Sequence, residues 1–128
     1  MINFKKQGKS NKVKGRRYEQ ETVKFLKQFD NTCGRTPNSG AIFGWEGDIL
    51  CRQHPLLAQA YIECKYRKNQ SLPAWIQESK DRIQQQNYLI VFYAKPYQPT
   101  KIYFENLLDQ KSQSFSSLKD FGKWLEKI

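Results

Sequence analysis

The chain has 128 residues, 38% of them hydrophobic, which is the size and composition of one domain with its own core. Its formal net charge of +10 is uneven, because the first 17 residues hold seven Lys or Arg and no acidic residue. Such a field attracts polyanions and favours a nucleic-acid partner over a basic tail that only aids solubility. No apolar run approaches the ~20 residues that cross a bilayer, so we expect a cytoplasmic protein without a membrane partner.

Residues 1–14 are rich in Lys, Gln, Ser, Asn and Gly and show no hydrophobic periodicity, which predicts a flexible basic arm. A single domain is expected to span residues 15–128. From Gly15 to Phe29, apolar residues recur at helical spacing and predict the first helix.

Glu19 is the exception to the polar pattern of this helix. It precedes Val23 by four residues and Leu26 by seven, so it lies on the apolar stripe. A carboxylate aimed inward needs a partner, because an unpaired buried charge is costly. The alternative is a glutamate at the edge of the stripe that reaches water or pairs with Arg16.

Two strands, at residues 41–52 and 60–67, are predicted on either side of a turn. Strands joined by so short a connection most simply pair as an antiparallel hairpin. The polar loop that precedes them, at residues 36–40, offers the hydroxyls of Thr36 and Ser39. These hydroxyls either hold a phosphate or serve only turn chemistry.

Successive side chains of a strand point to opposite faces, so Glu63 and Lys65 share one face of the second strand. The hairpin brings a carboxylate of the first strand onto the same face. Glu46 and Asp48 both have the required parity, and we prefer Asp48 because Gly47 gives its backbone room. Without a cation, two such carboxylates would repel each other.

Polar oxygens in this arrangement suit a divalent metal. Hydrolysis of a phosphodiester needs an activated water and neutralised charge, which Mg²⁺ or Mn²⁺ held by hard oxygen ligands can supply. Asp48, Glu63 and the backbone carbonyl of Cys64 offer such oxygens. Lys65 would orient or deprotonate the attacking water, or stabilise the charge of the transition state.

The cysteines and the single histidine, His54, point away from zinc. Cys33, Cys51 and Cys64 are odd in number and form no C-x-x-C pair, which argues against structural zinc and against a disulfide framework. We therefore expect Cys51 and Cys64 to be reduced, buried thiols.

The second half of the chain alternates helical and strand patterns. Ser71 and Pro73 mark the start of a helix, and residues 88–94 are an apolar run typical of a strand covered on both faces. A helix before a central strand predicts a crossover and a parallel strand pair. The remaining segments are read as a strand, a polar loop and a capped last helix, at residues 101–105, 109–116 and 117–128. This order indicates an α/β fold, a mixed sheet flanked by helices.

A known pattern is present in this arrangement. The D…E-x-K spacing resembles that of PD-(D/E)xK nucleases, and the chain is similar more specifically to archaeal-type Holliday junction resolvases and phage resolvase-like endonucleases. The resemblance covers roughly residues 15–94, with Gly47 where the pattern has proline. The residues that carry it are Asp48, the Glu63-Cys64-Lys65 strand, Glu19 on the first helix and the Ser39-Gly40 loop.

The resemblance implies a restriction-endonuclease-like fold, Mg²⁺-dependent cleavage of branched DNA such as a four-way junction, a homodimer, and a prokaryotic or phage-encoded protein. It also implies that Glu19, Asp48 and Glu63 hold the metal, that Lys65 is the catalytic lysine, and that Ser39 lies near the scissile phosphate. The basic residues expected to contact DNA are Lys12, Lys14, Arg16, Arg17, Arg35, Arg67 and Lys68. The alternatives are a nicking or end-processing nuclease, and a non-catalytic basic nucleic-acid-binding module.

Overall fold

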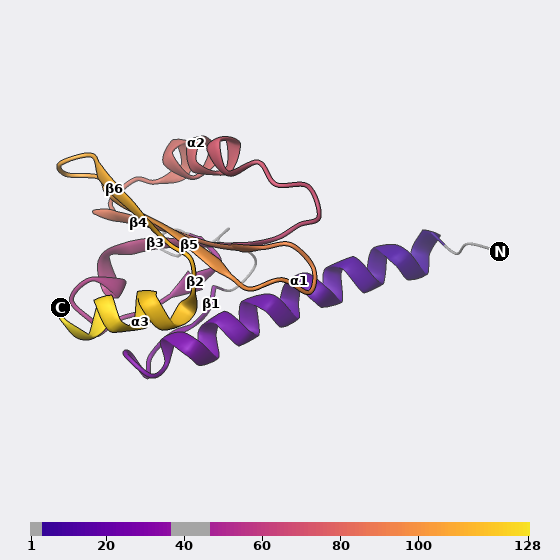
Figure 1. Ribbon diagram of the computed structural model, residues 1–128, viewed down its shortest axis with the longest axis horizontal. Coiled ribbons are helices and arrows are strands. Elements are labelled where there is room, and N and C mark those ends of the chain that lie inside the picture. The colour runs from indigo at the N-terminus through magenta and orange to yellow at the C-terminus, as the bar shows by residue number, and fades with distance from the viewer. Residues whose placement is uncertain (1–3, 37–46) are drawn as a thin grey trace.

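The computed structural model describes residues 4–36 and 47–128, and it has the expected mixed α/β architecture. Three helices accompany a six-stranded sheet whose strands lie in the order of the sequence (Figure 1). In chain order the elements are α1 (Phe4–Leu26), β1 (Gly34–Arg35), β2 (Ile49–Leu50), a 3-10 helix (Leu57–Gln59), β3 (Ala60–Tyr66), α2 (Leu72–Arg82), β4 (Tyr88–Ala94), β5 (Lys101–Asn106), β6 (Lys111–Phe115) and α3 (Leu118–Glu126).

The strand pairing confirms both predictions about the sheet. β2 and β3 pair as an antiparallel hairpin, and β3 and β4 pair in parallel because α2 carries the chain back between them. The remaining neighbouring strands are antiparallel. Of the first predicted hairpin strand, residues 47–52 are described and residues 41–46, with the competing Glu46, lie outside the described residues.

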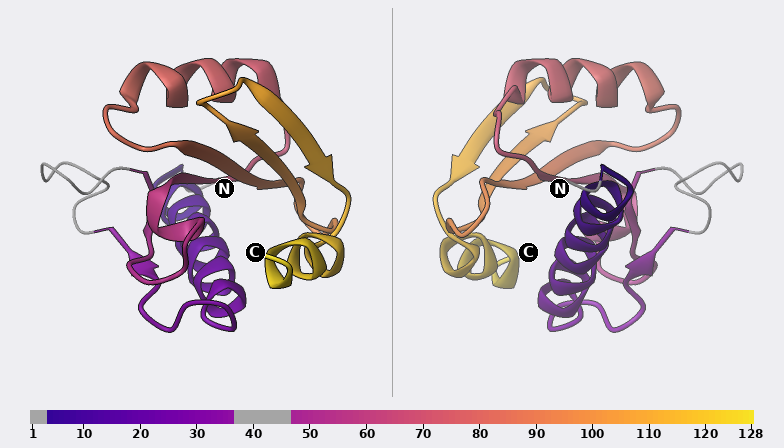
Figure 2. Two further views of the ribbon diagram at one scale, coloured as in Figure 1. Left: turned by 90° about the vertical axis from the view of Figure 1, so that its left-hand side faces the viewer. Right: turned by 90° about the vertical axis from the view of Figure 1, so that its right-hand side faces the viewer.

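The sheet forms the middle of three layers, with α2 on one face and both α1 and α3 on the other (Figure 2). The side chains of β3 alternate accordingly, so that Ile62 and Cys64 join the core beneath α1 and α3, and Tyr61 joins the core beneath α2. In β4 the residues from Leu89 to Phe92 are fully buried, as predicted for a strand covered on both faces. Phe121 and Leu125 of α3 are fully buried against the α1 side.

The first helix begins at Phe4, so the prediction of an irregular arm up to residue 14 is wrong. Extending an existing helix adds one hydrogen bond per residue without a new nucleation cost, and the Lys and Gln residues of this stretch are good helix formers. The first deeply buried side chain with described burial is Tyr18, and the helix projects beyond the sheet on its N-terminal side (Figure 1). The basic segment is therefore an extension of α1 rather than a separate unit.

Residues 111–115 form the edge strand β6 and not the predicted polar loop. The side chains of residues 111–114 are polar and exposed and only Phe115 at the end of the strand is apolar, so hydrophobic alternation does not reveal the strand. β6 is held by its backbone pairing with β5, from Asn106 opposite Lys111 to Ile102 opposite Phe115, and by the packing of Phe115 against Phe121 and Trp124 of α3. The capped start of α3 is confirmed, because the Ser117 hydroxyl accepts a hydrogen bond from the Asp120 N–H at 3.1 Å.

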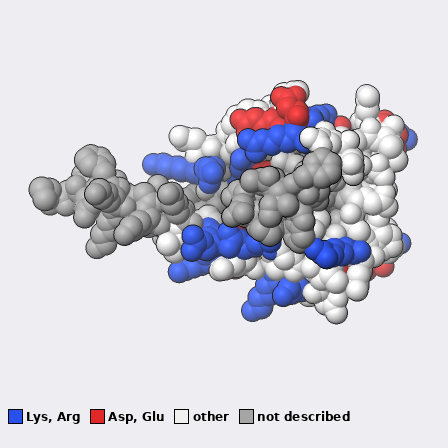
Figure 3. Space-filling view, turned by 180° about the vertical axis from the view of Figure 1, so that it is seen from behind, with Lys and Arg blue, Asp and Glu red and all other residues white. Residues whose placement is uncertain are grey.

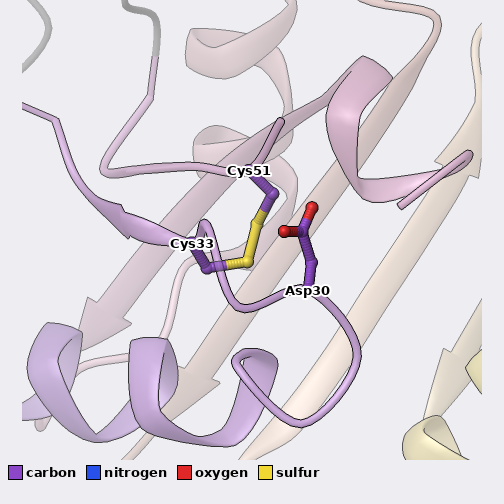
Figure 4. Close-up of side chains that lie close together, drawn as sticks. All are labelled: Asp30, Cys33 and Cys51. Carbon is purple, nitrogen blue, oxygen red and sulfur yellow. A yellow bond between two sulfur atoms is a disulfide. The ribbon is translucent and has the colours of Figure 1, made fainter. Parts of the chain in front are cut away.

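Cys33 and Cys51 form a disulfide, so the expectation that Cys51 is a reduced thiol is wrong (Figure 4). The β1–β2 register places Gly34 opposite Leu50, and the next pair outward is Cys33 and Cys51, whose Cα atoms are 4.1 Å apart. Cys64 is free and buried, as expected. The disulfide fixes β1 to β2 beside the position of Asp48.

Asp30 lies next to this disulfide and joins the end of α1 to the chain after β2 (Figure 4). Its carboxylate accepts hydrogen bonds from the N–H groups of Thr32, Gln53 and His54 at 2.8–2.9 Å. Burial alone would raise its pKa, but these bonds together with that of the Thr32 hydroxyl lower the pKa to about 2. Because the two neighbouring sulfur atoms are bonded to each other, we read this cluster as structural rather than as a metal site.

Candidate active site

The turn into β2 is built so that Asp48 meets β3 at close range. Gly47 has a φ of +80°, and a Cβ at this position would lie 2.7 Å from the carbonyl oxygen of Ile62. The Asp48 N–H donates to that same carbonyl at 2.7 Å. Glycine is thus required by backbone conformation and by space, which explains the Gly-Asp sequence at this point.

Thr36 supports the same turn from the other side. Its hydroxyl donates to the carbonyl of Gly47 at 2.6 Å, and its N–H donates to the carbonyl of Asp48 at 3.0 Å. Thr36 is buried, and its hydroxyl serves the turn, which is one of the two roles considered for it, the other being to hold a phosphate. Ser39, the other hydroxyl, lies outside the described residues.

Asp48 and Glu63 are neighbours across the hairpin. The register pairs Ile49 with Ile62, and the carboxyl groups of Asp48 and Glu63, the next residues on the two chains, are hydrogen-bonded to each other. Glu63 shares its face of β3 with Tyr61, which is the face that α2 covers. Glu63 is buried and Asp48 is half-buried. Burial, and next the negative charge of Glu63, raise the pKa of Asp48 to about 7.

The backbone of Cys64 is directed toward Asp48. Its N–H donates to Oδ2 of Asp48 at 2.8 Å, where a backbone carbonyl of β2 would stand in a longer ladder. The N–H and C=O of one strand residue point to the same side of the strand, so the Cys64 carbonyl also faces the β2 edge, beside Asp48. The Cys64 carbonyl as a third oxygen ligand stays a prediction.

Lys65 lies beside the two carboxylates. Its Nζ is 3.9 Å from Oε2 of Glu63, and its side chain is 19% exposed. Its positive charge also acts on Asp48, where it opposes the rise of the pKa. The three residues of the D…E-x-K spacing are thus brought together, with one ammonium facing two carboxylates.

Tyr61 and Arg82 extend the site beyond the residues that the sequence pointed to. Tyr61 is buried on the same face as Glu63, and its hydroxyl is hydrogen-bonded to Glu63 and to Arg82 at the end of α2. Burial and the charge of Glu63 raise the pKa of Tyr61, so it acts as a fixed donor to that carboxylate. The sequence placed Tyr61 on the face of Glu63, but only the packing of α2 shows that Arg82 reaches it.

Glu19 approaches from α1, on the other side of the sheet. Its Oε2 is 2.7 Å from Nε of Arg35 on β1, so the partner of this carboxylate is Arg35 and not Arg16. After burial, which dominates, the charges of Asp48, Glu19 and Glu63 all raise the pKa of the Cys64 thiol, which lies among them. Glu19 therefore lies close to the acidic pair without belonging to the same sheet face.

Basic side chains surround this end of the sheet. Lys14, Arg16 and Arg17 are exposed on α1, and Arg67 and Lys68 are exposed just after β3. Lys and Arg side chains gather on the side from which α1 projects (Figure 3). Lys12 lies in the part of α1 whose side chains are outside the described ones.

A hollow of about 430 Å³ opens on the α2 face farther along the sheet, over β5 and β6. It contains a second buried carboxylate, Glu105, whose Oε2 is 2.9 Å from Nζ of Lys80 and which also accepts a hydrogen bond from Tyr103. Glu63 has a similar lysine and tyrosine beside it, and it differs from Glu105 in having a second carboxylate, that of Asp48, in contact with it. We therefore take Asp48 and Glu63 as the candidate site.

Comparison with known protein families, with curated proteins and with solved structures found no match. Among the helices of the described residues, none is both long enough and apolar enough to cross a membrane.

Proposed function

We propose that the chain is a Mg²⁺- or Mn²⁺-dependent endodeoxyribonuclease that hydrolyses phosphodiesters in branched DNA, with a four-way junction as the preferred substrate. The observation that carries the proposal is the pairing of Asp48 with Glu63 across the β2–β3 hairpin, with Lys65 3.9 Å from Glu63. This geometry agrees with the resemblance to PD-(D/E)xK nucleases that the sequence suggested.

The donor set suits a hard divalent cation. Two carboxylates face each other at a half-buried position, and their repulsion helps to raise the pKa of Asp48 to about 7. A cation between them would remove this repulsion, and the oxygen atoms of Asp48, Glu63 and the Cys64 carbonyl are the ligands that Mg²⁺ and Mn²⁺ prefer. Sulfur is absent from this set, since the thiol of Cys64 points to the opposite face and is buried in the α1-side core.

Each residue then has a defined task. Asp48 and Glu63 hold the cation, which when bound neutralises phosphate charge and makes a water molecule more acidic. Lys65 directs its ammonium at the charge that develops on the phosphate, or orients the attacking water. Tyr61 fixes the Glu63 carboxylate, and Glu19, paired with Arg35, adds negative charge from the α1 side.

The DNA partner is supported by the distribution of charge. Arg67 and Lys68 are exposed and follow Glu63 by four and five residues, and further exposed Lys and Arg residues lie on α1, so a phosphate backbone bound to Arg67 and Lys68 would pass close to the strand that carries Glu63. Cutting two strands of a junction symmetrically requires two sites, so we propose a homodimer. Gel filtration with light scattering measures this directly, and a monomer at working concentration would contradict it.

The test of the enzyme is cleavage of labelled four-way junction, flap, duplex and single-stranded DNA in Mg²⁺, Mn²⁺ or EDTA. We expect metal-dependent cutting of branched DNA, lost in Asp48→Ala and Glu63→Ala but kept in the matched control Asp81→Ala on the exposed side of α2. The two inactive variants should still bind junction DNA in EDTA.

The other outcomes assign the rival functions. Cutting of nicked or tailed duplex in preference to junctions would indicate an end-processing nuclease. Binding of every substrate without cutting in any metal would reject the nuclease and leave a basic DNA-binding module. Loss of binding equal to the loss of cutting in Asp48→Ala would show that Asp48 is structural.

A further inference from the structure

The loop between β4 and β5, residues 95–100, presents one aromatic ring to solvent. Tyr97 is 92% exposed, whereas every other tyrosine of the chain is buried or half-buried. An isolated exposed ring needs no explanation by itself. Three features distinguish Tyr97 from an ordinary exposed ring: its backbone conformation, the contacts that anchor its loop, and the positive charges around it.

Tyr97 occupies a backbone position that favours glycine. Its φ is +62°, and the Gln98 N–H donates to the Lys95 carbonyl at 3.1 Å, which closes a turn with Pro96 in its second position. Proline followed by a residue of positive φ is the arrangement of a type II turn, in which glycine is preferred third. A tyrosine at this position costs stability relative to glycine, so Tyr97 stands here against the local backbone preference.

The loop is anchored at two points to one aromatic pair. The Tyr97 N–H donates to the hydroxyl of Tyr66 at 3.3 Å, and the Thr100 hydroxyl lies 3.0 Å from that of Tyr18. The rings of Tyr66 and Tyr18 are themselves stacked, with centroids 5.2 Å apart. The exposed ring thus stands on a turn fixed to α1 and β3, so a ligand that stacks on it would pay little to order the loop.

The surroundings of the ring are basic. Lys95 and Lys101 flank the loop, and the Arg67 N–H donates to the carbonyl at the end of β4 at 3.1 Å, which places Arg67 and Lys68 alongside. Residues 64–70 and 95–101 contain no acid. Tyr66, which holds Tyr97, is three residues beyond Glu63 and so about 10 Å from it along the strand. Its ring faces the α1 side of the sheet, whereas Glu63 faces the α2 side, so the platform lies at the end of the strand and not on the face of the acidic pair.

We infer that Tyr97 is a stacking platform for unpaired bases of DNA, and that it holds the branch point or single-stranded end of a substrate at the end of β3, the strand that carries Glu63 and Lys65. Stacking on an aromatic ring accepts any base, and the neighbouring cations hold the phosphates on either side. The role of Tyr97 in positioning a substrate rests on the proposed nuclease function, whereas base stacking on Tyr97 is measured by DNA binding without cleavage.

The experiment measures binding in EDTA, where no cleavage occurs, by fluorescence anisotropy of a flap with unpaired bases and of a fully paired duplex of equal length. We expect Tyr97→Ala to weaken flap binding by about 5- to 100-fold and duplex binding by less than about twofold. Tyr97→Phe and Tyr97→Trp should bind the flap as the natural chain does. Leu108→Ala, which removes a side chain 73% exposed on the β5–β6 turn, is the matched control and should bind as the natural chain does.

A further variant separates stacking from folding. Tyr97→Gly should have an unchanged or higher Tm, because glycine suits the turn, and should lose flap binding as Tyr97→Ala does. An equal loss on flap and duplex, full binding by Tyr97→Ala, or weak binding by Tyr97→Phe would each overturn the inference. A chain that never cuts DNA but shows the flap-specific loss would reject the nuclease and retain the platform.

Discussion

The crowding of Asp48 and Glu63 predicts a measurable stability effect in the metal-free protein. The pKa of Asp48 is raised from 3.8 to about 7, first by burial and next by the charge of Glu63. Between these pH values the unfolded chain has released the Asp48 proton and the folded chain still binds it. The unfolded state therefore binds fewer protons, and the free energy of unfolding falls as the pH rises through this window.

The size of the effect follows from the shift. About 3 pH units at about 1.4 kcal/mol per unit give an upper bound of about 4 kcal/mol, reached above pH 7. Asp48→Asn removes the charge while leaving an oxygen that can accept from the Cys64 N–H. We expect this variant to be more stable than the natural chain by about 2–4 kcal/mol at pH 8 in EDTA, or roughly 10 °C in Tm.

The assay is thermal unfolding of the natural chain, Asp48→Asn and the control Asp81→Asn, each at pH 5 and pH 8 with EDTA or Mg²⁺. The advantage of Asp48→Asn should shrink at pH 5, where Asp48 is already protonated. Mg²⁺ should raise the Tm of the natural chain at pH 8 and leave that of Asp48→Asn unchanged, because the metal binds only the charged site. An Asp48→Asn variant less stable than the natural chain at pH 8 in EDTA would refute the reasoning.

Three further predictions concern the frame of the site. Replacing Cys33 and Cys51 by Ser should lower the free energy of unfolding in urea by about 3 kcal/mol, the value expected for a disulfide that closes a loop of this length. Thiol alkylation of the denatured natural chain should label only Cys64, and labelling of all three cysteines would contradict the disulfide. Gly47→Ala should cost at least about 2 kcal/mol, whereas Gly34→Ala, with open space around its Cβ, should change stability by under about 0.5 kcal/mol; equal effects would contradict the close approach at Gly47. Glu19→Gln should lower the cleavage rate more than about tenfold while costing under about 1 kcal/mol of stability, because its ion pair is partly exposed; an unchanged rate would leave Glu19 with a structural role.

Local patterns were sufficient for the elements with a strong hydrophobic or capping signal. The apolar run at residues 88–94, the alternation in β3 and the capped last helix each carry a strong signal within a few residues. The pattern failed at β6, where residues 111–114 are polar and exposed and show no alternation, and where the strand depends on pairing with β5 and on the contacts of Phe115 with α3. It failed also at the start of α1, where the helix continues without an apolar stripe.

The cysteine pair shows the same limit. Cys33 and Cys51 are 18 residues apart in sequence, and an odd cysteine count suggested free thiols. Their bond depends on the register of two short strands, which neither segment specifies alone. The partner of Glu19 was likewise not predictable from the sequence, since Arg35 contacts Glu19 only when β1 lies against α1.

The sequence by itself determined which residues share a face, because the strand period of two placed Glu63 beside Lys65 and gave Asp48 the matching parity. Only the tertiary structure decided that these groups meet, through a glycine at φ +80° that lets β2 approach β3 and through a register that sets Asp48 opposite Glu63. The physical reason is that periodicity is a property of one segment, whereas register, burial and the raised pKa of Asp48 arise between segments.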